Sequence, residues 1–339
     1  MDITFLIGNG FDIGIGLRTR YEDFYQKYCC INANDSENIK AFKEMLKHRE
    51  DDKNKKIIDW ADFELAFGKH SEDFLIEEKD KYLERFEDFV SAFNAYLEEE
   101  ENNINYSEEV GLMMKNAVTT YFYIREADKI AMQGLYNRYN DKRRYNFISF
   151  NYTRSVDNCV KLLADELKKD NNRLVGSIEH IHGYIDANMI MGVNDPTQIT
   201  NPDFANDVDV VEELVKPQQN SDARTGYENK VASLINNSHV ICIYGMSIGA
   251  TDKKWWNLIS RWLAGNSVRK LVILKYVKKY NPRFTYLQRK ITNSIINDFL
   301  LYSDLPENKK EEIKKNIYIG ANHNVFEMNL RRKETDDEI

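Results

Sequence analysis

Apolar strand-like runs alternate with amphipathic helical patterns in the second half of the chain, whereas most of the first half follows a helical pattern. Residues 3–7, Ile-Thr-Phe-Leu-Ile, form an apolar run typical of a buried strand and lead directly into Gly8 and Gly10. Residues 36–144 are rich in Lys, Glu and Asp, and their aromatic residues recur at helical spacing. This region therefore predicts helices with solvated outer faces.

From residue 145 onward the pattern predicts a series of strands, separated by helices. The predicted strands are 145–150, 177–183, 239–244, 270–276 and 317–319, and the predicted helices are 156–169, 227–236, 252–264, 286–301 and 309–315. Such alternation indicates a parallel sheet with helices on both faces. We therefore expect an α/β Rossmann-like core made of residues 1–30 and 145–330, a large α-helical insertion at 31–144, and a charged tail at 331–339.

The composition argues against several classes of protein. The formal net charge is −8 and the isoelectric point about 5.5, which argues against a nucleic acid as the main partner. The mean hydropathy is −0.61, and no apolar run approaches the roughly 20 residues of a membrane span. The four cysteines form no Cys-x-x-Cys pair, so a zinc ribbon or a disulfide framework is not expected. With no basic leader before the first strand, the predicted location is the cytoplasm.

The turn after the first strand carries the strongest chemical signal. Gly8 and Gly10 match the first two glycines of G-x-G-x-x-G, a turn whose backbone N–H groups can cradle a phosphate. The third glycine position holds Ile13, and Gly14 comes one residue late. Asp12 would repel a pyrophosphate but could accept hydrogen bonds from ribose hydroxyls. An ordinary strand-to-helix turn is the alternative interpretation.

Three later predicted strands also end on small or polar residues, at 150–153, 180–183 and 245–252. In a parallel sheet these ends share one edge with the first turn. Asn151 could hold a ribose diol or a water molecule, or it could cap the following helix. Of the two histidines on one face of the strand, His182 is nearer its end and is the better candidate for a general base, although a buried structural role is the alternative. His180 and His182 could bind a metal, but no third ligand follows at regular spacing.

Acidic residues allow a second hypothesis. Asp62 and Glu64, near Trp60, are either the solvated start of a helix or carboxylates brought over a cleft. Together with Asp12 and Asp195 they could hold Mg²⁺ in a nuclease or phosphohydrolase. A third hypothesis is a non-enzymatic module that senses nucleotides or binds a phage protein.

In their order along the chain, these segments resemble the AbiH family of bacterial abortive-infection proteins, which defend against phage. The resemblance runs from residue 6 to about 276 and is carried by 6–12, Gly16-Leu17, Tyr21-x-x-Phe24, Trp60-x-Asp62-x-Glu64, 149–153, 180–183 and Gly245-x-Ser247 with Asp252. Where the family often has a histidine in the last loop, this chain has Met246.

The AbiH pattern is in turn similar to sirtuin-like NAD-binding domains. This chain lacks the Cys-x-x-Cys zinc module of sirtuin deacetylases, so protein deacetylation is not expected. Sirtuin-like defence effectors instead hydrolyse NAD, so the resemblance implies hydrolysis of NAD to ADP-ribose and nicotinamide, with no metal. It assigns catalytic roles to Asn151, His182 and Asp12. The residues it implies for NAD binding are Gly8, Asn9, Gly10, Phe11, Thr153, Gly245, Ser247 and Asp252. It further implies a phage-derived trigger and leaves assembly into homo-oligomers open.

Overall fold

The computed structural model describes residues 1–48, 62–119, 124–185, 187, 189–222, 226–277, 283–321 and 325–331. The chain forms two compact units, each built from separate segments. The sheet unit comprises residues 1–17, 104–181 and 227–339. The helical unit comprises residues 18–103 and 182–226.

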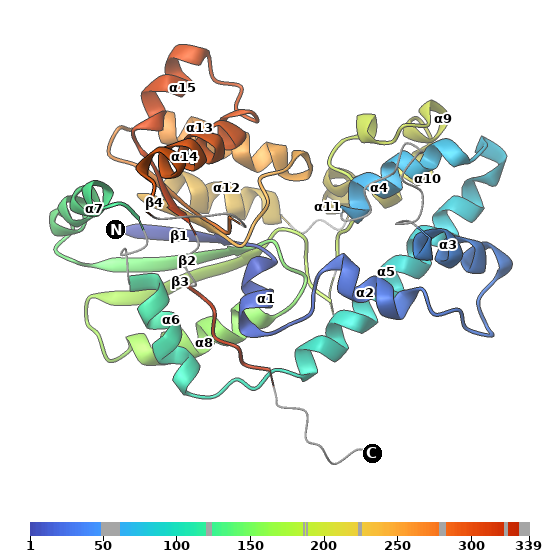
Figure 1. The fold of residues 1–339 in the computed structure, drawn as a ribbon, viewed down its shortest axis with the longest axis horizontal. Helices are drawn as coiled ribbons and strands as arrows, with labels where there is room; N and C mark the ends of the chain where they lie inside the picture. Colours follow the sequence, from blue (N-terminus) through green and yellow to red (C-terminus); the bar gives the residue numbers. More distant parts are fainter. Residues whose placement is uncertain are drawn as a thin grey trace. The chain divides into compact units, whose positions relative to one another are not determined.

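The sheet unit is organised around six parallel strands (Figure 1). They are β1 (Asp2–Ile7), β2 (Arg143–Ser149), β3 (Arg173–His180), β4 (Val240–Tyr244), β5 (Lys270–Lys275) and β6 (Ile317–Ala321). Every neighbouring pair is parallel, and the strand order is β3-β2-β1-β4-β5-β6. The predicted parallel α/β, Rossmann-like fold is confirmed. This is the strand order of dinucleotide-binding domains, and it reverses direction between β1 and β4.

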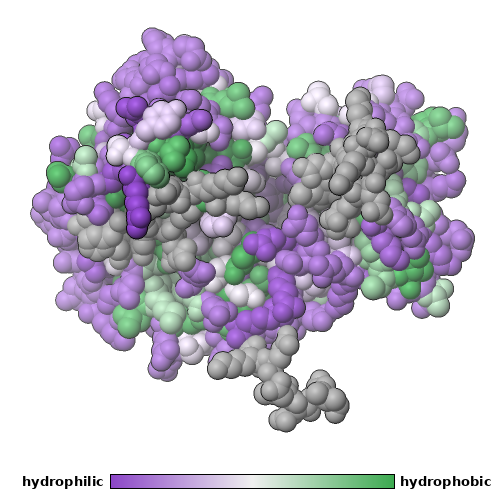
Figure 2. Space-filling model, viewed as in Figure 1, coloured by the Kyte–Doolittle hydropathy of each residue, from purple (hydrophilic) through white to green (hydrophobic). Residues whose placement is uncertain are grey.

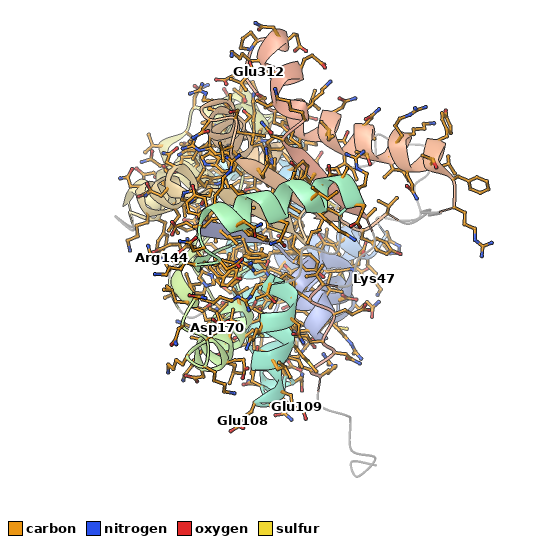
Figure 3. The ribbon with its side chains drawn as sticks, turned by 90° about the vertical axis from the view of Figure 1, so that its left-hand side faces the viewer. Lys47, Glu108, Glu109, Arg144, Asp170 and Glu312 are labelled. Atoms are coloured by element: carbon orange, nitrogen blue, oxygen red, sulfur yellow. The ribbon has the colours of Figure 1, made fainter. Side chains whose placement is uncertain are left out.

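Helices cover both faces of this sheet because side chains alternate along each strand. Ile3, Phe5 and Ile7 share one core with the first group of helices, whereas Leu6 belongs to the core on the opposite face. The first group is α1 (Gly10–Ile15), α6 (Glu109–Thr119), α7 (Glu126–Arg138) and α8 (Ser155–Leu167); the second is α12 (Tyr227–Asn237), α13 (Lys253–Ala264), α14 (Thr285–Leu300) and α15 (Glu307–Lys314). In Figure 3, Glu109 of α6 and Glu312 of α15 lie on opposite sides of the sheet.

The helical unit contains no named strand among its described residues and packs around aromatic side chains. Its helices are α2 (Tyr21–Tyr28), α3 (Glu37–Lys47), α4 (Phe63–His70), α5 (Lys79–Asn102), α9 (Pro202–Ala205), α10 (Val208–Leu214) and α11 (Lys216–Asp222), with short 3-10 turns at Ser71–Asp73, Ile76–Glu78 and Pro196–Gln198. The rings of Phe63 and Phe89 stack at 3.4 Å between centroids. Phe24 meets Phe89 edge to face, so α2, α4 and α5 share one core.

The two units divide the chain differently from the predicted insertion at 31–144. Helices α6 and α7 lie inside that range, but they belong to the sheet unit, where Val110 and Met114 of α6 join the core with Ile3 and Phe5. Conversely, residues 18–30 and 182–226 join the helical unit. The charged tail predicted at 331–339 lies outside the described residues, except for Arg331.

The visible surface is mainly hydrophilic (Figure 2). Helix α15, at the top of that view, has Lys and Glu on most of its exposed positions, which form the ion pairs Lys309–Glu312, Lys310–Glu307 and Lys314–Glu311. In the part of the chain that the structure describes, no helix is both long and apolar enough to cross a membrane.

Candidate functional site

The turn after β1 packs directly against the turn after β4. The Gly8 N–H donates to the Tyr244 carbonyl (3.0 Å), and the Gly10 N–H donates to the Gly245 carbonyl (2.8 Å). A Cβ atom on Gly10 would lie 2.5 Å from the Gly245 Cα, and Gly245 itself has φ +70°. Both positions therefore need glycine, one for close approach and the other for its backbone conformation. The two turns meet where the strand order reverses.

Three amides of this turn donate hydrogen bonds within the protein. Besides Gly8 and Gly10, the Phe11 N–H donates to the Gly8 carbonyl (2.9 Å). The Phe11 side chain is fully buried and meets the ring of Phe326 edge to face. The phosphate-binding role of the glycines stays a prediction. Two predicted ligand-binding residues of the paired turns, Asn9 and Ser247, are exposed to solvent.

Asp12 is buried in the sheet unit. Helix α1 begins at Gly10, so Asp12 occupies its first turn, where only 1% of its surface is exposed. The Thr153 hydroxyl donates to one carboxylate oxygen (2.7 Å), and the Ser155 hydroxyl donates to the other. Burial raises the pKa of Asp12 to about 6, because desolvation outweighs these hydroxyl bonds. We expected this carboxylate to face sugar hydroxyls; the hydroxyls that it contacts in the structure are those of Thr153 and Ser155, and its catalytic role stays a prediction.

Asn151 links the ends of three neighbouring strands. It follows β2, its side-chain amide donates to the Gly8 carbonyl after β1 (3.2 Å), and its own carbonyl lies 3.3 Å from Nδ1 of His180 at the end of β3. The residue is 5% exposed. Asn151 is not the cap of helix α8, whose N-cap residue is Arg154. The loop after β2 is therefore fixed from both sides.

His180 is the histidine that contacts this loop. It ends β3, is 3% exposed, and places Nε2 2.7 Å from Oδ2 of Asp157 in the first turn of α8. Each ring nitrogen of His180 therefore faces an oxygen acceptor, the Asn151 carbonyl on one side and the Asp157 carboxylate on the other. Ser155 and Asp157 were not predicted as site residues. The alternation of polar residues at 151, 153, 155 and 157 could have indicated that they face the same site.

His182, the predicted general base, lies beyond the strand. Because β3 ends at His180, the expected same-face pair of strand histidines does not form. His182 belongs to the helical unit, is 6% exposed, and its carbonyl accepts a hydrogen bond from the Ile190 N–H (2.8 Å). The catalytic role of His182 stays a prediction.

The acidic residues considered as metal ligands each have a local partner. Asp62 caps α4 by accepting from the Leu65 N–H (3.3 Å), and Asp195 caps the turn Pro196–Gln198. Glu64 is buried and pairs with Lys216 (2.7 Å). Trp60 lies outside the described residues. Within the ranges that the structure describes, no three His, Cys, Asp or Glu side chains gather in a way that could hold a metal ion.

Asp252 lies at the start of α13, at the end of the 3-10 turn η4 (Ala250–Asp252). It is the N-cap residue of the helix by position, but its side chain makes no capping hydrogen bond. It is half-buried. The predicted contact of Asp252 with a nucleotide stays a prediction.

Comparison with known families identifies a matching family. A family model described as bacteriophage abortive infection AbiH matches residues 4–274. That range begins within β1 and ends within β5, so it includes Asp12, Asn151, His180 and Gly245. A search of curated proteins finds no match to this chain.

Proposed function

We propose a function from one premise: this chain belongs to the bacteriophage abortive infection AbiH family. Membership of the family implies a role in phage abortive infection defence. Within that role, we propose that the protein binds NAD and hydrolyses it to ADP-ribose and nicotinamide. A phage-derived trigger and self-assembly are proposed as the controls on this activity.

One observation carries the proposal of a dinucleotide ligand. The turns of Gly8–Gly10 and Gly245 meet at the carboxyl ends of β1 and β4, where the order β3-β2-β1-β4-β5-β6 reverses. In open α/β sheets, ligands bind in the crevice at this point. The exposed Asn9 and Ser247 on the paired turns offer polar groups to such a ligand.

The proposed reaction needs only a few catalytic side chains. Water adds to C1′ of the nicotinamide ribose while the C–N glycosidic bond breaks, and the bonding electrons leave with nicotinamide, which departs as a neutral molecule. The water loses one proton to a base, and no strong general acid is needed. We propose that Asn151 positions the ribose or the water and that His182 accepts the proton. Asp12 is better suited to holding the Asn151 loop, since Thr153 and Ser155 occupy both its oxygens.

The test is to incubate the purified full-length protein with NAD and to follow nicotinamide and ADP-ribose by chromatography. The assay is run with and without extract of phage-infected cells, and with and without EDTA. Equal release of both products, unaffected by EDTA, supports the proposal. Absence of both products under every condition contradicts it. Thermal stabilisation by NAD without products would favour a nucleotide-sensing module, and inhibition by EDTA a metal-dependent enzyme.

Variants then test the assigned residues. Asn151→Ala should lower nicotinamide release about 100-fold or more, because the reacting groups lose their alignment. Asn158→Ala, on the same loop-helix segment, is the matched control and should keep the activity. His182→Ala should also abolish release if it is the base. Thermal unfolding of each variant separates loss of chemistry from loss of the fold.

A further inference from the structure

The segment from Lys275 to Lys290 differs in charge from the rest of the chain. It contains six Lys or Arg residues and no Asp or Glu, although the whole chain has a net charge of −8. Four aromatic residues are interspersed among these basic residues. The described part of this segment is 275–277 and 283–290, at the carboxyl end of β5 and the start of α14.

Helix α14 is buried at one end only. Ile295, Ile296, Phe299 and Leu300 pack into the core beside the sheet, whereas no residue from Thr285 to Lys290 is buried. The Tyr286 side chain is 64% exposed, and Phe284 just before the helix is 56% exposed. In Figure 3, a helix in the pale red of this part of the chain extends outward with its side chains around it. These two exposed rings are available to stack on a planar partner.

The basic residues of this surface also differ from those of the next helix. On α15, the cations of Lys309, Lys310 and Lys314 each pair with a glutamate one turn away. Among the described residues, no carboxylate pairs with Arg289 or Lys290 of α14, and both are exposed. Their charge is therefore available to an anionic partner.

The exposed face of α14 borders a shallow hollow that is wide open to solvent. Residues spaced along this one helix line it, namely Tyr286, Arg289, Lys290, Asn293, Ser294 and Asn297. An aromatic ring can stack on a base, the two cations can contact phosphates, and the amides and the hydroxyl can hydrogen-bond to base edges or sugars.

We propose that the α14 surface, defined by Phe284 and the six residues of the hollow, binds single-stranded nucleic acid. Charge complementarity and exposed rings fit the stacking platforms and basic grooves that hold single strands. A helix that binds an anionic membrane buries an apolar face in the lipid, whereas Asn293, Ser294 and Asn297 make this face of α14 polar. The acidic balance of the whole chain argues against a nucleic acid covering its surface, and this patch is a local exception. The proposal does not depend on NAD hydrolysis.

The experiment measures fluorescence anisotropy of labelled oligothymidine and oligouridine on titration with the full-length protein at low and rising salt. Binding of either strand that weakens with salt is expected, because phosphate contacts release counterions. Arg289→Glu combined with Lys290→Glu should weaken binding at least about 10-fold and reduce the log–log salt slope by about 1.4, at roughly 0.7 per lost phosphate contact. Lys309→Glu combined with Lys310→Glu on α15 makes the same charge change and should leave binding unchanged.

Stacking is tested separately. Tyr286→Ala should weaken binding about 5- to 150-fold, the range found for loss of one stacked base, while Tyr286→Phe keeps the ring and should bind normally. Three results would overturn the proposal: no anisotropy change for either strand at low salt, equal weakening by the α14 and α15 charge reversals, or equal affinity for a duplex of the same length. Sedimentation with anionic vesicles in place of strand binding would assign the surface to a membrane. The variants change exposed side chains, apart from the half-buried Lys310 of the control, and thermal unfolding checks that each is folded.

Discussion

Two buried carboxylates, one from each unit of this protein, are stabilised in different ways. Asp12 in the sheet unit accepts hydrogen bonds from two hydroxyls, those of Thr153 and Ser155. Glu64 in the helical unit pairs with the ammonium group of Lys216 at 2.7 Å, and its other oxygen lies 3.4 Å from the Gly192 N–H. Hydroxyls stabilise a charge without neutralising it, whereas an ammonium group neutralises it.

The two carboxylates therefore have different roles: burial shifts the pKa of Asp12, whereas the ion pair of Glu64 joins two segments of the chain. The Glu64–Lys216 pair joins residues 152 apart in sequence and links α4 to the start of α11. Asp12 keeps a pKa of about 6 and can change charge near neutral pH. Perturbed groups of that kind cluster at functional sites, and Asp12 lies beside the loop of Asn151 and the Gly8–Gly10 turn. Four substitutions test this comparison, in order of decreasing expected effect.

Removing the cation of the helical unit should have the largest effect. Lys216→Met leaves the Glu64 carboxylate buried without its partner and should lower the free energy of unfolding by about 3–5 kcal/mol. Chemical denaturation at neutral pH measures it. The double variant Glu64→Leu, Lys216→Met removes both charges and should recover much of the loss. Equal losses in the single and double variants would contradict the importance of the unpaired charge.

Asp12→Asn should change how stability depends on pH. The folded-state pKa of Asp12, about 6, exceeds its ordinary value of 3.8, so the folded protein binds the proton more tightly than the unfolded chain does. Its contribution to stability is therefore fully present below about pH 4 and is lost as pH rises through about 6. Across that range the wild type should lose about 3 kcal/mol that the variant does not lose. Urea unfolding at pH 4 to 8 measures both, and parallel pH profiles would contradict the assignment.

Removing one hydroxyl donor should have a smaller effect that depends on pH. Thr153→Val deprives the Asp12 carboxylate of one hydrogen bond and should cost about 1.5–3 kcal/mol at pH 8. The cost should shrink at pH 4, where the carboxyl group is protonated, and the pKa of Asp12 should rise further. Thr197→Val, at an exposed threonine, is the matched control. The same cost at both pH values would show that the hydroxyl is not serving the charge.

Asp157→Asn should have the smallest effect. The Asp157 side chain is 31% exposed, so weakening its pair with His180 should cost about 1 kcal/mol or less in thermal unfolding. Asp165→Asn on the same helix, where the carboxylate is more exposed and pairs with Lys168, should change nothing measurable. A loss well above the expected size would mean that the Asp157–His180 pair is as central to the fold as the buried ion pair.

Much of the sheet could be predicted because its signal is local. Apolar runs such as 3–7 and 239–244 can be buried on both sides only in a covered sheet, and glycine follows each of them. The boundaries of the helical region could not be predicted in the same way. Helices α6 and α7 both supply apolar side chains to the core of the sheet unit, and the partner of such a helix face is set by tertiary packing.

The candidate site was predicted in part. The strand-end positions of Gly8, Asn151 and Gly245 follow from the parallel sheet, and the structure brings them together through the contacts of Gly8 with Asn151 and of Gly10 with Gly245. The preference for His182 over His180 assumed that the strand continued to residue 183. It ends at His180, and the partner of that histidine, Asp157, comes from the first turn of a helix.

The sequence by itself determined the family, the parallel α/β class and the glycine turn, because each is written in short runs or in their order along the chain. Tertiary structure alone decided that Asp12 is buried, that Thr153 and Ser155 hold it, and that a lysine far along the chain neutralises Glu64. Hydrogen-bond partners and desolvation depend on which segments meet in space. These tertiary contacts cannot be inferred from short stretches of the sequence.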